Sequence, residues 1–256
     1  MPFISVNDGT FYYEDLGSGP SLVFLHGFMG SGRSDTGAEL DWLATRYRVI
    51  APDLRGYSQS YPKPRSYPAD FYRRDALDVL AIIQALHLER PHVLGFSDGG
   101  EVAIRTAELL PLRSTAAWGA IGFYGPEMAP IIRNHLPPTW ITEAMKARQG
   151  PYWEQMVNDW VAAMLGLIAS GGDISHVDAD RIKCPLLIML GTMDKLNPIA
   201  VAERLTARVP GARLEVFNNI GHMIHEQAPD RFRQVLGDFL AAADSGRIAH
   251  LNTDRK

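Results

Sequence analysis

One short stretch constrains the fold more than any other: the run VLGFSDGG from Val93 to Gly100. An apolar approach leads into Gly-x-Ser-x-Gly, and a helical pattern continues to about residue 110. This order is typical of a strand that turns sharply into a helix with a serine, Ser97, at the tip. Gly95 and Gly99 lack the Cβ atoms that would collide in so tight a turn. Ser97 is expected to have a strained backbone at a helix N-terminus, where developing negative charge is favoured.

Strands and helices are predicted to alternate along most of the chain. The predicted strands cover residues 10–16, 21–25, 48–51, 92–96, 115–121, 185–190 and 214–217. Helical periodicity covers residues 39–46, 69–87, 101–110, 199–209 and 230–243. Strands separated by helices imply βαβ units, so we expect an α/β fold with a mostly parallel central sheet flanked by helices. Ligands of such sheets bind beyond the carboxyl ends of the strands.

The segment 124–173 interrupts this alternation. It contains no convincing strand but several prolines and three tryptophans. We predict a helical lid, inserted into a core domain made of residues 1–123 and 174–244, with a flexible tail at 245–256. An ordinary surface excursion is the alternative interpretation. The lid is expected to select the substrate through apolar side chains that line a pocket. The residues expected there are Trp140, Trp153, Met156 and Trp160 from the lid, and Met29 from the core.

Composition excludes several classes of protein. The 256 residues carry a net charge of −4 without an evident basic face, so no nucleic-acid partner is expected. No apolar run is long enough to span a membrane. Cys184 is the only cysteine, so no intrachain disulfide can form. The first residues lack the features of a secretory signal. We therefore expect a cytoplasmic enzyme, acting as a monomer or small homo-oligomer on a small molecule.

A serine at such a turn becomes nucleophilic only beside a base that an acid orients. In this kind of fold the chain order is serine, then aspartate or glutamate, then histidine. Asp194 follows the strand 185–190, and His222 follows the strand 214–217. Both positions lie at carboxyl ends of strands, the same edge as Ser97. We predict that Ser97, Asp194 and His222 form a catalytic triad.

Each partner of Ser97 has an alternative. Asp194 could merely begin a turn, whereas Asp173, Asp178 and Asp180 precede their strand and are expected in surface turns. His225, which is predicted near a short helix, is the rival base. The spacing His222-x-x-His225-Glu226 hints at a metal site, but it matches neither zincin order and has no evident third ligand. We therefore expect no metal and no cofactor.

The oxyanion of an acyl-transfer intermediate needs two backbone N–H donors. The first is expected from Asp98, directly after the nucleophile, and the second from Phe28, in the turn that follows the strand 21–25. The Phe28 side chain can at the same time act as an apolar plug, since only its backbone is required.

Five segments together resemble the α/β-hydrolase superfamily, and within it the biphenyl hydrolase-like, or valacyclovir hydrolase, branch. They are HGFMGSG from His26, PDLRGY from Pro52, GFSDGG from Gly95, GTMD from Gly191, and Gly221-His222. A stretch like YPADFYRRDA, from Tyr67, also occurs in that branch. The resemblance covers roughly residues 10 to 243. It implies the same triad, no cofactor, and a role for Asp53 and Arg55 in bracing loops near the site.

These observations predict a serine hydrolase that cleaves small carboxylic esters through an acyl-enzyme. Epoxide hydrolases and dehalogenases with an aspartate nucleophile are excluded, because the turn offers Ser97. Carbon–carbon bond hydrolases and perhydrolases share the serine and stay open as alternatives. A slow-turnover small-molecule receptor on the same fold is the alternative from another class.

Overall fold

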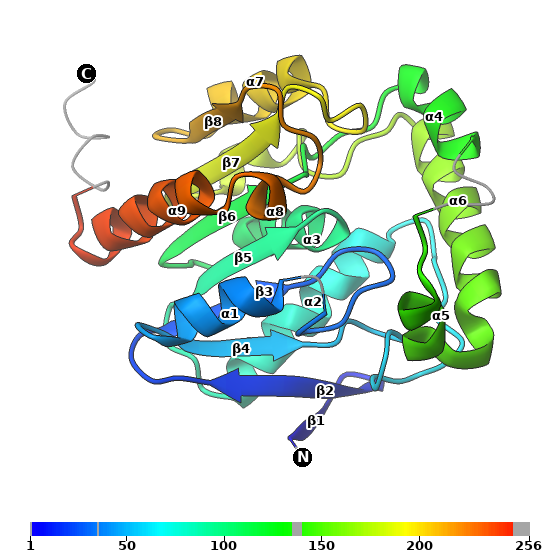
Figure 1. Cartoon of the computed structure of the whole chain (residues 1–256), viewed down its shortest axis with the longest axis horizontal. Helices are drawn as coiled ribbons and strands as arrows, with labels where there is room; N and C mark the ends of the chain where they lie inside the picture. The colour runs from blue at the N-terminus through cyan, green and yellow to red at the C-terminus, as the bar shows by residue number, and fades with distance from the viewer. Residues whose placement is uncertain (1, 35, 135–139, 248–256) are drawn as a thin grey trace.

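The computed structural model describes residues 2–34, 36–134 and 140–247, which form an eight-stranded sheet with helices on both faces (Figure 1). The strand order is β1-β2-β4-β3-β5-β6-β7-β8. The first two pairings are antiparallel, and every pairing from β4 to β8 is parallel. The predicted α/β fold with a mostly parallel sheet is therefore confirmed.

The strands are β1 (Phe3–Val6), β2 (Gly9–Leu16), β3 (Ser21–Leu25), β4 (Arg48–Pro52), β5 (His92–Phe96), β6 (Ser114–Trp118), β7 (Leu186–Gly191) and β8 (Arg213–Phe217). The helices of the core are α1 (Gly37–Ala44), α2 (Phe71–Ala85), α3 (Asp98–Leu109), η3 (Ala179–Arg181), α7 (Ile199–Arg208), α8 (Ile224–Gln227) and α9 (Pro229–Asp244).

Alternate residues of the central strands face opposite layers of helices. On β3, Val23 and Leu25 pack in the core beneath α2 and α3, whereas Leu22 and Phe24 pack in the core beneath α1 and α9. Strands that are buried on both faces read as continuous apolar runs, which is why β3 and β5 were predicted with their observed bounds.

Two differences from the predicted strands have local causes. Strand β1, which was not predicted, is four residues long and pairs only with β2 at the edge of the sheet, so its burial pattern is weak. Strand β6 ends at Trp118 rather than at residue 121. Gly119 follows with a φ of 64°, a left-handed conformation that takes the chain out of the strand.

The segment 124–173, called the lid, forms helices beyond the carboxyl ends of the parallel strands (Figure 1). Its described elements are η1 (Pro126–Met128), α4 (Ala129–Arg133), α5 (Glu143–Gln149), η2 (Gly150–Tyr152) and α6 (Trp153–Ala169). An antiparallel bridge between Phe123 and Asp173 joins its two ends. The insertion therefore leaves and re-enters the core at one place. Residues 135–139 of the lid, and 248–256 of the predicted tail, lie outside the described residues.

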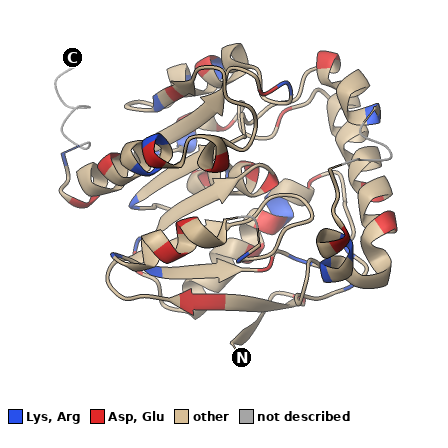
Figure 2. Cartoon of the chain, viewed as in Figure 1, with Lys and Arg blue, Asp and Glu red and all other residues tan. Residues whose placement is uncertain are grey.

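Charged residues of both signs are interspersed over the helices and loops (Figure 2). In the described ranges, no helix is long and apolar enough to cross a membrane.

Candidate active site

The turn between β5 and α3 has the predicted geometry. Ser97 has φ 53° and ψ −124°, and it is the N-cap of α3. A Cβ on Gly95 would lie 2.0 Å from the carbonyl oxygen of Gly99, and a Cβ on Gly99 would lie 2.2 Å from that of Leu25. Both contacts are impossible, so only glycines permit this turn. The expected strain at the serine and the expected role of the two glycines are confirmed.

A continuous hydrogen-bonded array joins the three residues that were predicted as a triad. Ser97 Oγ lies 3.0 Å from His222 Nε2, and His222 Nδ1 lies 2.7 Å from Asp194 Oδ2. Asp194 follows β7 and His222 follows β8, so adjacent parallel strands deliver both side chains to the edge that carries Ser97. Gly119 lies against the imidazole: a Cβ there would be 2.6 Å from His222 Cε1.

Two further groups besides His222 hydrogen-bond to the Asp194 carboxylate. Its Oδ1 accepts from the Leu196 N–H (3.0 Å), and its Oδ2 accepts from Asn197 Nδ2 (2.9 Å). Burial would raise the pKa of Asp194, but the hydrogen bond and charge of His222, with these two donors, lower it below its ordinary value. The carboxylate therefore stays ionised beside the imidazole. Sequence reasoning missed Asn197, because nothing in its local pattern distinguishes it from a turn residue.

The alternatives to these residues lie elsewhere. His225, on α8, is buried, and the Trp118 indole donates to its Nδ1 over 3.1 Å. Asp173 accepts backbone N–H groups of its own turn, and Asp178 pairs with Arg105. In the described part of the chain, no three histidine, cysteine or acidic side chains are grouped so that they could hold a metal ion.

The loop after β3 runs directly against the nucleophile. A Cβ on Gly27 would lie 3.1 Å from Ser97 Cβ. Asp98 opens α3, so its N–H has no helical carbonyl to pair with. Within the described ranges, neither this N–H nor that of Phe28 donates to another group of the chain. The two N–H groups that were predicted as oxyanion donors are therefore not used within the described part of the chain.

The Asp98 side chain links the turn to the lid. Tyr72 Oη, from α2, donates to its Oδ1, and Trp160 Nε1, from α6, donates to its Oδ2, each over 2.8 Å. Burial raises the pKa of Asp98 to about 6, although both hydrogen bonds act to lower it. No sequence signal pointed to this link.

A cavity of about 380 Å³ opens onto Ser97 and His222. Its other lining residues are Phe28, Phe96, Asp98, Tyr124, Ile132, Trp140, Met145, Trp160, Leu196, Asn197 and Met223. The Phe28 ring stacks on Trp160 with a centroid distance of 4.7 Å and meets Trp140 edge-on at 6.0 Å. This volume and apolar lining suit a small organic ligand.

The residues that were predicted to line this cavity divide into two groups. Trp140 and Trp160 line it. The other three are not among its lining residues. Met29 and Met156 are buried in the core instead, and Trp153 packs beneath the Lys146 ammonium, 4.8 Å from the ring centre. The lid residues that sequence reasoning missed, Tyr124, Ile132 and Met145, carry no pattern that separates a pocket-facing side chain from a core-facing one.

Fold, turn and hydrogen-bonded array together define an α/β hydrolase, and the chain belongs to the alpha/beta hydrolase family, which it matches over residues 22–235. Its sequence is similar to serine hydrolase BPHL of Mus musculus, with 31% identity over 93% of this chain and 85% of the relative. The same protein of Homo sapiens is 30% identical, with equal coverage.

The chain is also similar to hydrolases that are named for 2-hydroxy-6-oxo acids. The chain is 28% identical to a 2-hydroxy-6-oxononadienedioate/2-hydroxy-6-oxononatrienedioate hydrolase of Pseudomonas putida, over 91% of this chain and 92% of the relative. The solved structure of a 2-hydroxy-6-oxo-6-phenylhexa-2,4-dienoate hydrolase from Rhodococcus superposes with a TM-score of 0.77. It is 21% identical and covers 92% of this chain and 96% of its own, a likeness of fold alone.

Proposed function

We propose that this hydrolase cleaves small carboxylic esters through Ser97, His222 and Asp194. The observation that carries the proposal is the unbroken array from Ser97 Oγ to His222 Nε2 (3.0 Å) and from His222 Nδ1 to Asp194 Oδ2 (2.7 Å). The similarity to serine hydrolase BPHL supports the same reading.

In this mechanism His222 Nε2 takes the Ser97 proton as Oγ attacks the ester carbonyl carbon. Asp194 orients the imidazole and stabilises its cation. The N–H groups of Phe28 and Asp98 stabilise the oxyanion. Collapse of the tetrahedral intermediate breaks the carbon–oxygen bond, and His222 returns the proton to the leaving alcohol. Water, activated by the same base, then hydrolyses the acyl-enzyme.

The pocket supports a small, largely apolar substrate. Its lid residues Trp140, Met145 and Trp160 face the same space as Ser97, so we place substrate selection in the lid. Carbon–carbon bond hydrolysis is the second candidate, because a relative that is named for a 2-hydroxy-6-oxo diacid aligns over 91% of this chain.

The test combines a fluorophosphonate probe with chromogenic esters of increasing acyl length. We expect the wild type to be labelled at one residue and to turn over short esters steadily. Ser97→Ala should lose both labelling and turnover while keeping its circular dichroism spectrum. Labelling of that variant at another residue would disprove the assignment. A burst without sustained turnover would favour the slow receptor, and cleavage of a vinylogous diketone in preference to esters would favour the carbon–carbon hydrolase.

A further inference from the structure

One strained residue lies in the oxyanion loop, the segment from His26 to Gly32, and a second lies in a neighbouring loop. Met29, in the loop, has φ 61°, and Ser58, in a neighbouring loop, has φ 44°. Left-handed backbone is unfavourable for residues with a Cβ, so both conformations persist only if the surrounding structure holds them. The fully buried Met29 side chain supplies one restraint.

A single lid residue hydrogen-bonds to the backbone of both. Gln149, the last residue of α5, is only 1% exposed. Its Nε2 donates to the carbonyl oxygens of Met29 (2.9 Å) and Gly30 (3.1 Å). Its Oε1 accepts from the Ser58 N–H (2.9 Å). The reversed amide would set oxygen against two carbonyls, so the contacts determine the orientation. Arg148, its neighbour, also donates to the Met29 carbonyl, over 3.2 Å.

These bonds reach the peptide that carries one oxyanion donor. The Phe28 N–H belongs to the same planar peptide unit as the Gly27 carbonyl. That carbonyl accepts from the Gly30 N–H over 3.1 Å and lies 2.8 Å from His26 Nδ1. Gly30 therefore joins the two ends of the path: its carbonyl is held by Gln149, and its N–H holds the peptide of Phe28.

We propose that Gln149 is a positioning residue for catalysis: from the lid, it clamps the oxyanion loop so that the Phe28 N–H is aimed at the oxyanion. The inference rests on the proposed function and deepens it. The lid then contributes to the chemistry as well as to substrate choice. Oxyanion donors act only when they are preorganised, and loss of one donor typically reduces kcat by about 10²- to 10³-fold.

The test compares Gln149→Met with Gln155→Met. Both replace a lid glutamine with an unbranched side chain, but Gln155 is exposed on α6 and donates to Asp159 of its own helix. We expect Gln149→Met to lower kcat about 10- to 100-fold, because the donor is misaligned rather than removed. KM should stay unchanged, and Gln155→Met should behave as the wild type.

The inhibition constant of a boronic acid is a measurement that a purely structural role of Gln149 would leave unchanged. A boronic acid forms a tetrahedral adduct with a nucleophilic serine, so its inhibition constant should rise by the factor by which kcat falls. Gln149→Glu keeps the acceptor for Ser58 but loses the donors to Met29 and Gly30, and it serves if the methionine variant does not fold. We expect it to show the same loss of kcat.

Three results would overturn the inference. One is wild-type kcat and boronate affinity in a folded Gln149 variant whose Ser97 still reacts with the fluorophosphonate, which leaves the proposed function standing. Another is an equal loss of kcat in Gln155→Met. The third is a wild type that neither reacts at Ser97 nor hydrolyses esters, which overturns the proposed function as well.

Discussion

Strand β5 has a serine–histidine–aspartate array at each end. At its carboxyl end lie Ser97, His222 and Asp194. At its amino end His92, the first residue of the strand, places Nδ1 2.7 Å from Ser114 Oγ and Nε2 3.2 Å from Asp244 Oδ1. Distances alone hardly separate the two arrays.

The two arrays differ in the burial and backbone conformation of their residues. Ser114 and His92 are 0% exposed, and Ser114 lies in the regular strand β6 rather than at a strained turn. Burial lowers the pKa of His92 to about 4, although Asp244 acts to raise it. Asp244 is also engaged by Tyr47 and Arg113. The amino-end array therefore ties α9 to the sheet.

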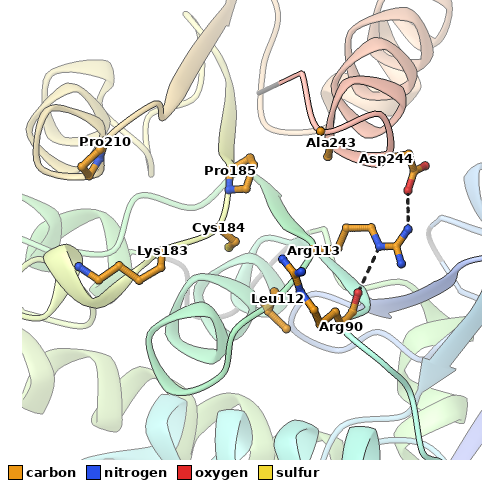
Figure 3. A pocket seen from close by; sticks show the side chains of 10 residues that line it. Arg90, Leu112, Arg113, Lys183, Cys184, Pro185, Pro210, Ala243 and Asp244 are labelled. Carbon is orange, nitrogen blue, oxygen red and sulfur yellow. Dashed lines mark hydrogen bonds and ion pairs between the residues drawn. The ribbon is translucent and has the colours of Figure 1, made fainter. Parts of the chain in front are cut away.

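Cavity size does not single out the end that carries Ser97 either. A cavity of about 460 Å³ lies at the amino edge, larger than the one beside Ser97. Arg113 lines it, held between Asp244 and the Arg90 carbonyl (Figure 3). Neither Ser114 nor His92 is among its lining residues. Ser97 lines its cavity and stands at a strained turn, whereas Ser114 does neither, and these two features separate the ends.

The largest contrast is expected from matched aspartate substitutions. Asp194→Asn should reduce kcat about 10⁴-fold, because asparagine no longer favours the tautomer in which Nε2 accepts the serine proton. Asp244→Asn should leave kcat unchanged and lower the melting temperature. Steady-state kinetics with one chromogenic ester checks both. Comparable losses of kcat in the two variants would erase the distinction between the ends.

The next contrast is the pH dependence of stability at the amino end. Since the pKa of His92 is about 4 in the folded protein and ordinarily about 6.5, the unfolded chain binds more protons between these values. Protonation of His92 in the unfolded chain therefore lowers the free energy of unfolding as the pH falls from 6.5 to 4, by about 3 kcal/mol over this range.

Acidic groups oppose this trend, so a difference measurement is needed. Burial raises the pKa of Asp98 to about 6 and of Glu101 and Glu108 to about 7, and their protonation stabilises the fold as pH falls. His92→Asn should be less stable than the wild type at pH 7, by a margin that narrows toward pH 4. Urea unfolding at several pH values measures the margin. A constant margin would mean that His92 does not titrate as its burial implies.

The smallest difference between the two ends is expected when one additional hydrogen-bond donor is removed from each aspartate. Asn197→Ala should lower kcat about tenfold, because a hydrogen bond to the ionised Asp194 is worth about 1.5 kcal/mol or more. Tyr47→Phe removes the donor to Asp244 and should cost about 1 kcal/mol of unfolding free energy without changing kcat. A kcat effect of Tyr47→Phe, or none of Asn197→Ala, would show that the two carboxylates are not used differently.

Much of the fold and of the candidate triad could be predicted from local pattern. The glycines around Ser97 have one steric explanation. Buried parallel strands can be recognised in the sequence as continuous apolar runs. The chain order of Asp194 and His222, each just after a strand, then placed both at one edge of the sheet. These inferences succeed because each depends on a residue and its near neighbours.

Contacts between distant segments were decided by tertiary structure alone. Gln149 meets Met29 across 120 positions of the chain, and Trp160 meets Asp98 across 62. Nothing near Gln149 marks it as a buried clamp, and nothing near Met156 or Met145 says which one faces the core and which the pocket. Side-chain direction at these positions is settled by how helices pack over the sheet, and the packing depends on all the elements at once.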